Sequence, residues 1–242
     1  MSKTIAIFGF GPGLGMGVAR RFGREGFRIA VIGRHPDKAA QHVADLKAEG
    51  LEAVSFQADV TDPVQITDTV AAIEATLGPI DVALHGAAAD MSVRAPSTLA
   101  VDLPDLRLPM ALKLHSPILM TRALLPGMLA RGAGALLFSS GSTPRLVHPY
   151  LANVGVALAA QRAYVLQLAA ETHDTGVRIA LLNIGVLIGG SQAERVIDEH
   201  PELVPAGVSM SIPRMTNTEL GEHYWDLYTR RDTVEQDVGF AA

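Results

Sequence analysis

The sequence predicts an α/β fold, in which a doubly wound, mostly or wholly parallel sheet of seven strands carries helices on both faces. Two observations predict it. Short apolar runs rich in β-branched residues alternate with longer helix-like segments along the chain. Glycines stand in the turns before most of these runs, where a helix ends and a strand begins. Such alternation is typical of parallel sheets, because each crossover between parallel strands needs a helix.

The strands are expected at Thr4–Phe8, Arg28–Ile32, Ala53–Phe56, Val82–His85, Ala135–Phe138 and Arg178–Ile184, with Val234–Phe240 as a seventh, terminal strand. We expect residues 1–242 to form one domain, since the chain has no linker, internal repeat or low-complexity tract. Ser191–Thr218 interrupts the alternation with three prolines. This excursion is expected to be irregular and to lie beyond the carboxyl ends of the strands, as a lid over a substrate, with Met210 and Met215 as apolar surface.

Composition limits the classes of function. Hydrophobic residues make up 48% of the 242 residues and charged residues 19%, which suits a large core. A net charge of -5 without a basic cluster argues against nucleic acid or a membrane surface as a partner. The lack of cysteine excludes thiolate chemistry and fits a reducing compartment. No signal peptide, membrane span or metal-ligand spacing is recognised, so a soluble, cytoplasmic protein without a metal is expected.

The stretch FGFGPGLGMG, Phe8–Gly17, places five glycines in ten residues directly after the first strand. A glycine-rich turn between a strand and a helix lets the backbone approach a pyrophosphate, and the start of the helix holds its charge. The stretch therefore predicts a Rossmann-type, dinucleotide-binding turn. The residues expected to contact the cofactor here are Gly9, Gly11, Gly13, Leu14 and Gly15.

The end of the second strand indicates which dinucleotide binds. NAD sites usually carry an acid about 20 residues after the glycines, for the ribose 2′-hydroxyl, whereas an arginine there binds a 2′-phosphate. Arg34 occupies this position and no acid does. NADP(H) is therefore expected rather than NAD.

Three motifs resemble those of the short-chain dehydrogenase/reductase family. Phe8–Gly15 is similar to its T-G-x-x-x-G-x-G, with Phe8 in place of threonine, and Ala58–Thr61 is similar to its D-V turn. Leu168–Glu171 resembles the end of its long fifth helix. The resemblance implies that Asp59 accepts from the adenine amino group, with Val60 nearby. It also implies further cofactor contacts at Gly86 and Ala87 after the fourth strand, and at Gly185 and Val186 beside the nicotinamide.

The sequence departs from the family at the catalytic positions. Alignment on the family's helices puts Lys113 at the active-site asparagine, Val154 at the catalytic tyrosine and Leu158 at its lysine partner. No Y-x-x-x-K occurs in the chain. The usual serine falls near Gly141, which is flanked by Ser140 and Ser142. The family's tyrosine–lysine proton relay is therefore missing.

Three hypotheses remain open. In the first, the acid has moved: Tyr150 lies one helical turn before Val154, Ser140 or Ser142 polarises the substrate, and Lys113 supplies charge. In the second, hydride passes to a substrate that needs no strong acid, such as an iminium ion. In the third, the chain binds the dinucleotide without redox chemistry. His85 is interpreted as a hydrogen-bonded core histidine.

We therefore expect an NADP(H)-dependent oxidoreductase that transfers hydride to a small organic carbonyl, imine or enone through an atypical site. Its catalytic candidates are Lys113, Ser140 and Tyr150. The alternative is a non-redox NADP(H)-binding protein, acting as a sensor, a scaffold or a cyclase. The resemblance further implies a homo-oligomer, dimer or tetramer, formed through the helices Asp105–Ala130 and Pro149–His173.

Overall fold

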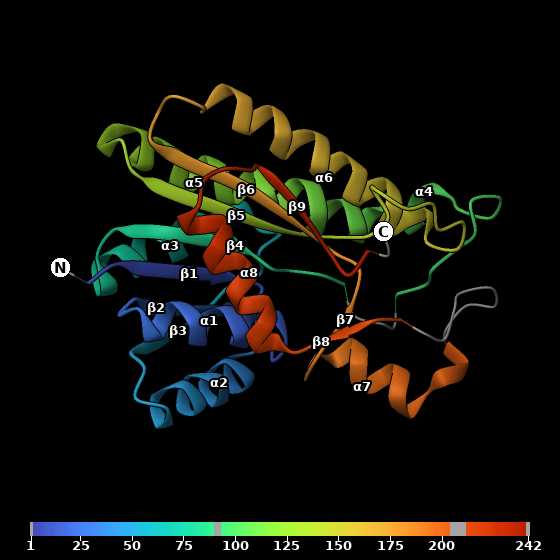
Figure 1. Ribbon diagram of the computed structural model, residues 1–242, viewed down its shortest axis with the longest axis horizontal. Helices are drawn as coiled ribbons and strands as arrows, with labels where there is room; N and C mark the ends of the chain where they lie inside the picture. Colours follow the sequence, from blue (N-terminus) through green and yellow to red (C-terminus); the bar gives the residue numbers. More distant parts are fainter. Residues whose placement is uncertain (1, 90–92, 204–211, 241–242) are drawn as a thin grey trace.

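The structure, a computed structural model, describes residues 2–89, 93–203 and 212–240, and its centre is a sheet of seven strands (Figure 1). The order is β3-β2-β1-β4-β5-β6-β9, and all neighbours are parallel. The strands are β1 (Thr4–Phe8), β2 (Arg28–Gly33), β3 (Ala53–Gln57), β4 (Ile80–His85), β5 (Gly134–Gly141), β6 (Val177–Ile184) and β9 (Glu235–Val238). They confirm the seven expected strands, with bounds that differ by a few residues.

Helices cover both faces of the sheet, as expected. They are α1 (Leu14–Arg24), α2 (Pro36–Ala48), α3 (Pro63–Leu77), α4 (Leu103–Met110), α5 (Ser116–Arg131), α6 (Ala152–Glu171), α7 (Gln192–Glu199) and α8 (Asn217–Thr229). Side chains alternate along β1, so that Ala6 and Phe8 pack with α3, α5 and α6, whereas Ile5 and Ile7 pack with α1, α2 and α8. Figure 1 shows α5 and α6 on one side of the sheet and α8 across the other. None of the described helices is long and apolar enough to cross a membrane.

Close packing of two helices fixes the start of α1. A Cβ on Gly17 would lie 1.9 Å from the backbone oxygen of Asn217, and one on Gly221 would lie 2.6 Å from the oxygen of Gly17. Only glycine allows α1 and α8 to approach this closely. The contact holds the beginning of α1, and with it the glycine-rich loop, against α8.

A short π-helix, η1 (Ala111–His115), joins α4 to α5 in one continuous helical run. Pro117 follows it, and a proline has no N–H to donate to the carbonyl four residues earlier, here that of Lys113. The backbone N–H of Ser116 instead donates to the oxygen of Ala111, five residues back. The expected helix Asp105–Ala130 is thus present, with a wider turn at Lys113.

The expectation of an irregular Ser191–Thr218 was wrong for most of its described part. It contains α7, a 3-10 turn η2 (Pro201–Leu203) and β8 (Arg214–Met215), which pairs with β7 (Leu187–Ile188), before α8 begins. Ser191 caps α7 by accepting from the N–H of Glu194 at 3.1 Å, and Glu194 accepts from the N–H of Gly190. All three prolines follow α7, so they do not interrupt it. Pro205 and Met210 lie outside the described residues.

An ion-pair cluster ties α6 to the last strand of the sheet. Arg162 of α6 donates two hydrogen bonds to the carboxylate of Glu235 on β9, at 2.6 and 2.7 Å. Asn183 of β6 donates to the same carboxylate at 2.7 Å and to Asp237 at 2.8 Å. These bonds hold the middle of α6 over β6 and β9.

Replacing Gly17 tests the helix contact. Gly17→Leu should lower the free energy of unfolding by roughly 2–3 kcal/mol, because α1 and α8 must separate. Gly127→Ala is the control, since a Cβ on this α5 glycine would meet only the Arg131 side chain, at 3.7 Å. Gly127→Ala should instead raise the free energy of unfolding by about 0.5–1 kcal/mol. Urea unfolding followed by circular dichroism measures both, and an unchanged midpoint for Gly17→Leu would contradict the packing.

Candidate functional site

A cleft of about 900 Å³ lies at the carboxyl ends of the strands, among the loops that follow β1, β2, β4 and β6. The expected site residues that line it are Gly9, Gly11, Gly13, Leu14, Gly15, Arg34, Val60, Gly86, Ala87, Val186, Lys113 and Ser140. Asp59, Gly185 and Tyr150 are not part of its lining. The structure thus brings most of the expected residues together in one place.

The loop between β1 and α1 presents backbone to the cleft. Gly9 has a φ of +77°, and a Cβ there would lie 2.4 Å from Ala87, so this position requires glycine. A Cβ on Gly11 would meet no atom within 4 Å. Gly13 begins α1 without a side-chain cap, and the first turn holds no acidic residue. The open backbone and the positive end of the helix dipole suit a pyrophosphate.

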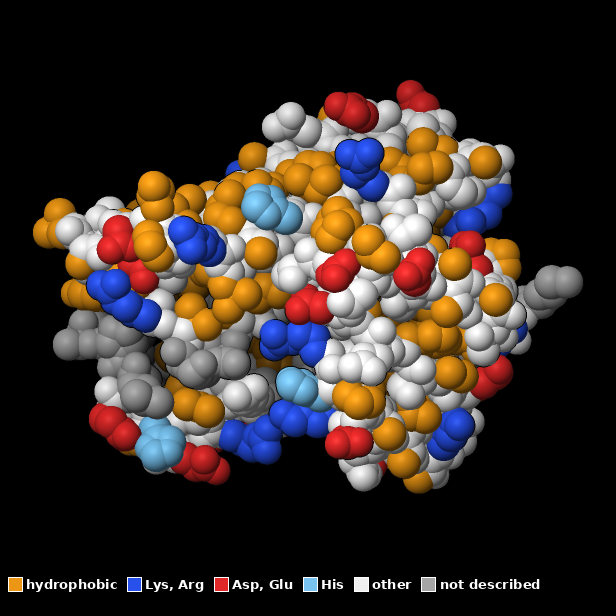
Figure 2. All heavy atoms as spheres, turned by 180° about the vertical axis from the view of Figure 1, so that it is seen from behind, with side chains coloured by type: hydrophobic (Ala, Val, Ile, Leu, Met, Phe, Trp, Pro, Cys, Tyr) orange, Lys and Arg blue, Asp and Glu red, His pale blue; other side chains and the backbone are white. Residues whose placement is uncertain are grey.

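Basic side chains gather where β2 ends and α2 begins. Arg34, Lys38 and His42 line the cleft there, and Arg195 of α7 also lines it. Figure 2 shows Lys and Arg side chains with a histidine beside a hollow in the lower middle of that view. Burial lowers the pKa of His42 below its ordinary value, so Arg34 and Lys38 carry the positive charge. Their charges suit a phosphate group.

An aromatic ring lies beside this basic group. The ring of Phe10 packs against that of His42, with centroids 5.2 Å apart and planes tilted by 40°. A Cβ on Gly15 would lie 3.1 Å from the Phe10 ring, which therefore covers the start of α1. Phe10 gives this end of the cleft a flat apolar surface.

Asp59 and Gly185 have structural roles in the loops where they lie. Oδ1 of Asp59 accepts from the N–H of Thr61 at 2.9 Å and from its hydroxyl at 2.7 Å, which closes the turn after β3. Gly185 donates its N–H to the oxygen of Val238 at 2.8 Å. Their chain neighbours Val60 and Val186 line the cleft instead.

Lys113 lies at the opposite end of the cleft from the basic residues Arg34, Lys38 and His42. The π-helix carries it, and the residue is only 9% exposed although it lines the cleft. Its ammonium donates a long hydrogen bond of 3.4 Å to the oxygen of Ser139, and no carboxylate forms an ion pair with it within the described ranges. Burial lowers the pKa of Lys113 to about 8. The amine is therefore close to its titration point at neutral pH.

The end of β5 places hydroxyl groups next to this lysine. Ser140 is buried and lines the cleft, and its Oγ has no hydrogen-bond partner among the described residues. Ser139 Oγ donates to the oxygen of His85 at 3.1 Å, and His85 Nε2 pairs with Ser116 Oγ at 2.8 Å. Burial, and then Lys113, lowers the pKa of His85 to about 3, so this ring is neutral. Ser140 is thus the hydroxyl left free for a ligand.

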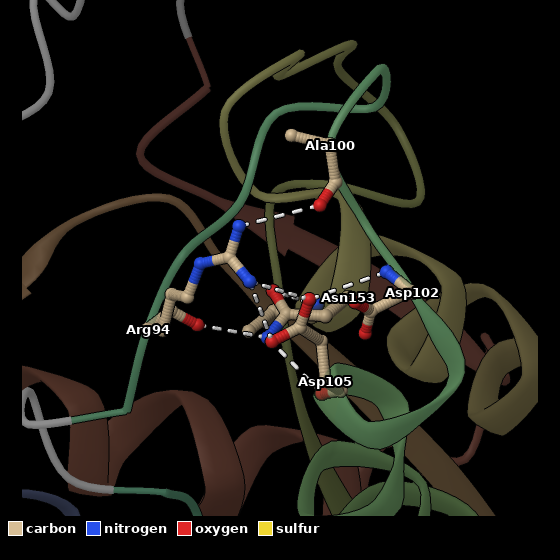
Figure 3. A network of polar contacts seen from close by, with 6 residues as sticks. Arg94, Ala100, Asp102, Asp105 and Asn153 are labelled. Carbon is tan, nitrogen blue, oxygen red and sulfur yellow. Dashed lines mark hydrogen bonds and ion pairs between the residues drawn. The ribbon is translucent and has the colours of Figure 1, made fainter.

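Apolar residues form the wall beside Lys113 and Ser140. Val154 and Leu158 of α6, which the family resemblance puts at the tyrosine and lysine positions, both line the cleft. The buried Asn153 fixes this turn (Figure 3). Its Nδ2 donates to the backbone oxygens of Arg94 at 2.9 Å and Asp105 at 3.3 Å. Its Oδ1 accepts from the N–H of Val154 at 2.9 Å. Val154 and Leu158 bring no proton donor to this wall.

The structure does not bring Tyr150 into the cleft. The helical spacing from Tyr150 to Val154 needs a helix from Pro149, but α6 begins at Ala152, after the non-helical Leu151. Tyr150 is 38% exposed. The geometry therefore offers Lys113 and Ser140, and not Tyr150, to a substrate.

Sequence reasoning missed several residues of the cleft: Phe10, Lys38, His42, Ser139 and Arg195. Lys38 and His42 stand four residues apart, shortly after β2 ends at Gly33, and this spacing puts both on one helix face. The pattern Ser191-x-x-Glu194 is a helix-start signal that predicts α7, and hence the position of Arg195. No signal marks Ser139 apart from Ser140.

Comparisons with known proteins agree with this architecture. A family model described as short chain dehydrogenase matches residues 3–199. The chain is 29% identical over 225 residues to a short chain dehydrogenase of Pseudocercospora fijiensis, covering 89% of this chain and 71% of that protein. It is 30% identical over 207 residues to 2-(S)-hydroxypropyl-CoM dehydrogenase 3 of Xanthobacter autotrophicus, covering 84% and 79%.

Among solved structures, that of an actinorhodin polyketide ketoreductase variant with NADPH superposes with a TM-score of 0.86, at 21% identity. The match covers 98% of this chain and 95% of that one. This likeness concerns the fold, whereas the family model matches the sequence itself over most of its length. The chain therefore belongs to the short-chain dehydrogenase family.

Proposed function

We propose that the protein is an NADP(H)-dependent oxidoreductase that transfers hydride to a small organic carbonyl, imine or enone. Lys113 and Ser140 act there in place of the family's tyrosine and lysine. The observation that carries the proposal is their position: a buried amine and a free hydroxyl line the same cleft as the glycine-rich loop. A member of this family with such a cleft has both a place for the dinucleotide and groups for the substrate.

The residues of the cleft fit the cofactor. The open backbone at Gly11 and the uncapped start of α1 would hold the pyrophosphate, and Arg34 with Lys38 would hold a 2′-phosphate. When bound, the reduced nicotinamide supplies the hydride. NAD is less favoured, because no acid lines the cleft at the end of β2. The NADPH held by the polyketide ketoreductase supports the same choice.

Lys113 and Ser140 activate the substrate. Ser140 Oγ donates a hydrogen bond to the carbonyl oxygen, and the Lys113 ammonium stabilises the negative charge that develops on this oxygen as hydride arrives. With its pKa lowered to about 8, Lys113 also exchanges a proton readily near neutral pH. Val154 and Leu158 exclude water from the reacting groups and so strengthen these interactions.

One alternative is non-redox binding of NADP(H), by a sensor, a scaffold or a cyclase. The observation that favours it is the apolar pair Val154 and Leu158, which cannot form the family's proton relay. Such a protein keeps the glycine-rich loop and Arg34 but transfers no hydride.

We also propose a cytoplasmic homo-oligomer. Exposed apolar side chains occur on the helices that the family resemblance assigns to subunit contacts: Leu108 on α4, Leu129 on α5 and Val156 on α6. A second copy of this chain would bury them.

Transfer of label from NADPH deuterated at C4 tests the proposed function. Wild-type protein should move deuterium into at least one member of a panel of ketones, imines and enones. Ser140→Ala should slow the transfer by about 10²-fold, because the oxygen loses its hydrogen-bond donor. Ser142→Ala is the control, since Ser142 pairs with His148 and does not line the cleft. Bound NADPH without label in any product would favour the non-redox alternative.

Changing Arg34 tests the cofactor. Arg34→Asp should weaken NADPH binding by roughly 2 kcal/mol or more and leave NADH binding unchanged or stronger, because a charge-assisted contact to the 2′-phosphate is lost. The control is Arg122→Asp, at an exposed arginine of α5 outside the cleft, which should leave the affinities for NADPH and NADH unchanged. Fluorescence titration measures both cofactors, and equal losses for NADPH and NADH would contradict this role.

Removing the buried amine should stabilise the protein. Below pH 8 the folded chain holds a desolvated ammonium, whereas the unfolded lysine keeps its proton up to pH 10.5. Wild-type stability therefore rises between these values. Lys113→Met should raise the free energy of unfolding at pH 7 by on the order of 3 kcal/mol, and the gain should shrink toward pH 10. Urea unfolding at both pH values checks this, with the exposed Lys47→Met as control. If Lys113→Met raised the free energy of unfolding equally at both pH values, desolvation of the ammonium would not be the cause.

A further inference from the structure

We propose that Lys113 acts as a nucleophile, forming an iminium with the carbonyl carbon of an α,β-unsaturated aldehyde or ketone, whose double bond the protein then reduces. This inference rests on the proposed function and specifies both its substrate class and the way in which the carbonyl group is activated.

The surroundings of Lys113 suit a nucleophile. The chain has four lysines, and Lys3, Lys38 and Lys47 are exposed, so Lys113 is the buried one. Its Nζ makes one long bond, to the oxygen of Ser139, and no ion pair within the described residues. Burial lowers the pKa of Lys113 to about 8, so near pH 8 about half of this amine is neutral and able to act as a nucleophile.

The neighbouring residues suit condensation with a carbonyl group. Ser140 lines the same cleft, and its buried Oγ has no hydrogen-bond partner in the described part of the chain, so this hydroxyl can donate to the oxygen of the carbinolamine. Leu112, Val154 and Leu158 also line the cleft and give this end an apolar surface. Such a surface accepts the hydrocarbon part of a conjugated substrate and limits premature hydrolysis.

The reaction balances in each step. The amine adds to the carbonyl carbon, and uptake of one proton with loss of one water leaves a cationic iminium conjugated with the double bond. This proton is released again when the final hydrolysis frees the amine. Hydride from the reduced nicotinamide then adds to the β carbon and gives a neutral enamine. A proton adds to the α carbon, and water hydrolyses the saturated iminium, which frees Lys113 and the saturated carbonyl product. The net change is addition of one hydride and one proton to the double bond.

This balance selects conjugated substrates. With a saturated carbonyl, hydride can add only to the iminium carbon itself. That addition forms a stable secondary amine, and Lys113 stays alkylated. A saturated aldehyde with NADPH should therefore inactivate the protein, whereas an enone should be turned over.

Trapping with cyanoborohydride tests the covalent step without NADPH. Wild-type protein incubated with cinnamaldehyde and cyanoborohydride should gain the mass of the aldehyde less one oxygen atom, on the peptide that holds Lys113. Lys113→Met and Lys113→Arg should lose this adduct, and Lys113→Arg keeps the positive charge. Labelling confined to exposed lysines, or equal in wild type and variants, would overturn the inference.

Oxygen exchange tests the same step during turnover. When cyclohex-2-enone is reduced in H₂¹⁸O with NADPH, hydrolysis of the iminium should put ¹⁸O into the product well above the exchange seen with Lys113→Arg. Reduction with the original oxygen retained would overturn the inference and leave the proposed function standing. Trapping at Lys113 without reduction of any substrate would instead support iminium formation and contradict the proposed function, together with the reduction step that the inference takes from it.

Discussion

The position of β1 in the sheet is the constraint on which the rest of the molecule depends. β1 pairs with β2 on one side and with β4 on the other, so the chain winds outward from it in both directions. The loops after β1 and β4 therefore diverge to opposite faces, and a crevice opens between them. Gly9 lies against Ala87 at this point, so the two loops separate only beyond that contact. This arrangement determines the positions of both ends of the cleft: Arg34, Lys38 and His42 at one end and Lys113 at the other.

A buried amine in an apolar cleft has opposite effects on folding and on chemistry. The π-helix η1 places Lys113 where little solvent reaches it, so its ammonium is desolvated in the folded state. The same desolvation makes the amine reactive near neutral pH. Val154 and Leu158 contribute to it, because a tyrosine and a lysine at those positions would bring hydrogen bonds and charge to the cleft.

Local patterns in the sequence predicted the strands, because a buried parallel strand is an apolar run with a glycine before it. They also predicted the glycine-rich loop and Arg34, whose positions follow from the end of a strand. Prediction failed where a boundary depended on a local detail. The helix assumed from Pro149 begins at Ala152, which removes Tyr150 from the face of Val154. The three prolines led to the expectation of an irregular segment, although Ser191 caps α7 and all three prolines lie after that helix. The burial of Lys113 depends on tertiary packing, and no local sequence pattern predicts it.

The cluster of Arg162, Glu235 and Asn183 implies that one wall of the cleft is anchored late in synthesis of the chain. α6 carries Val154 and Leu158, and its middle is held by Glu235 on β9, the last of the seven strands to be made. The glycine-rich loop, in contrast, belongs to the first strand and helix and is made at the outset. On a ribosome the two walls of the cleft are therefore completed at different times. The nascent chain has the glycine-rich loop long before the wall beside Lys113 is anchored.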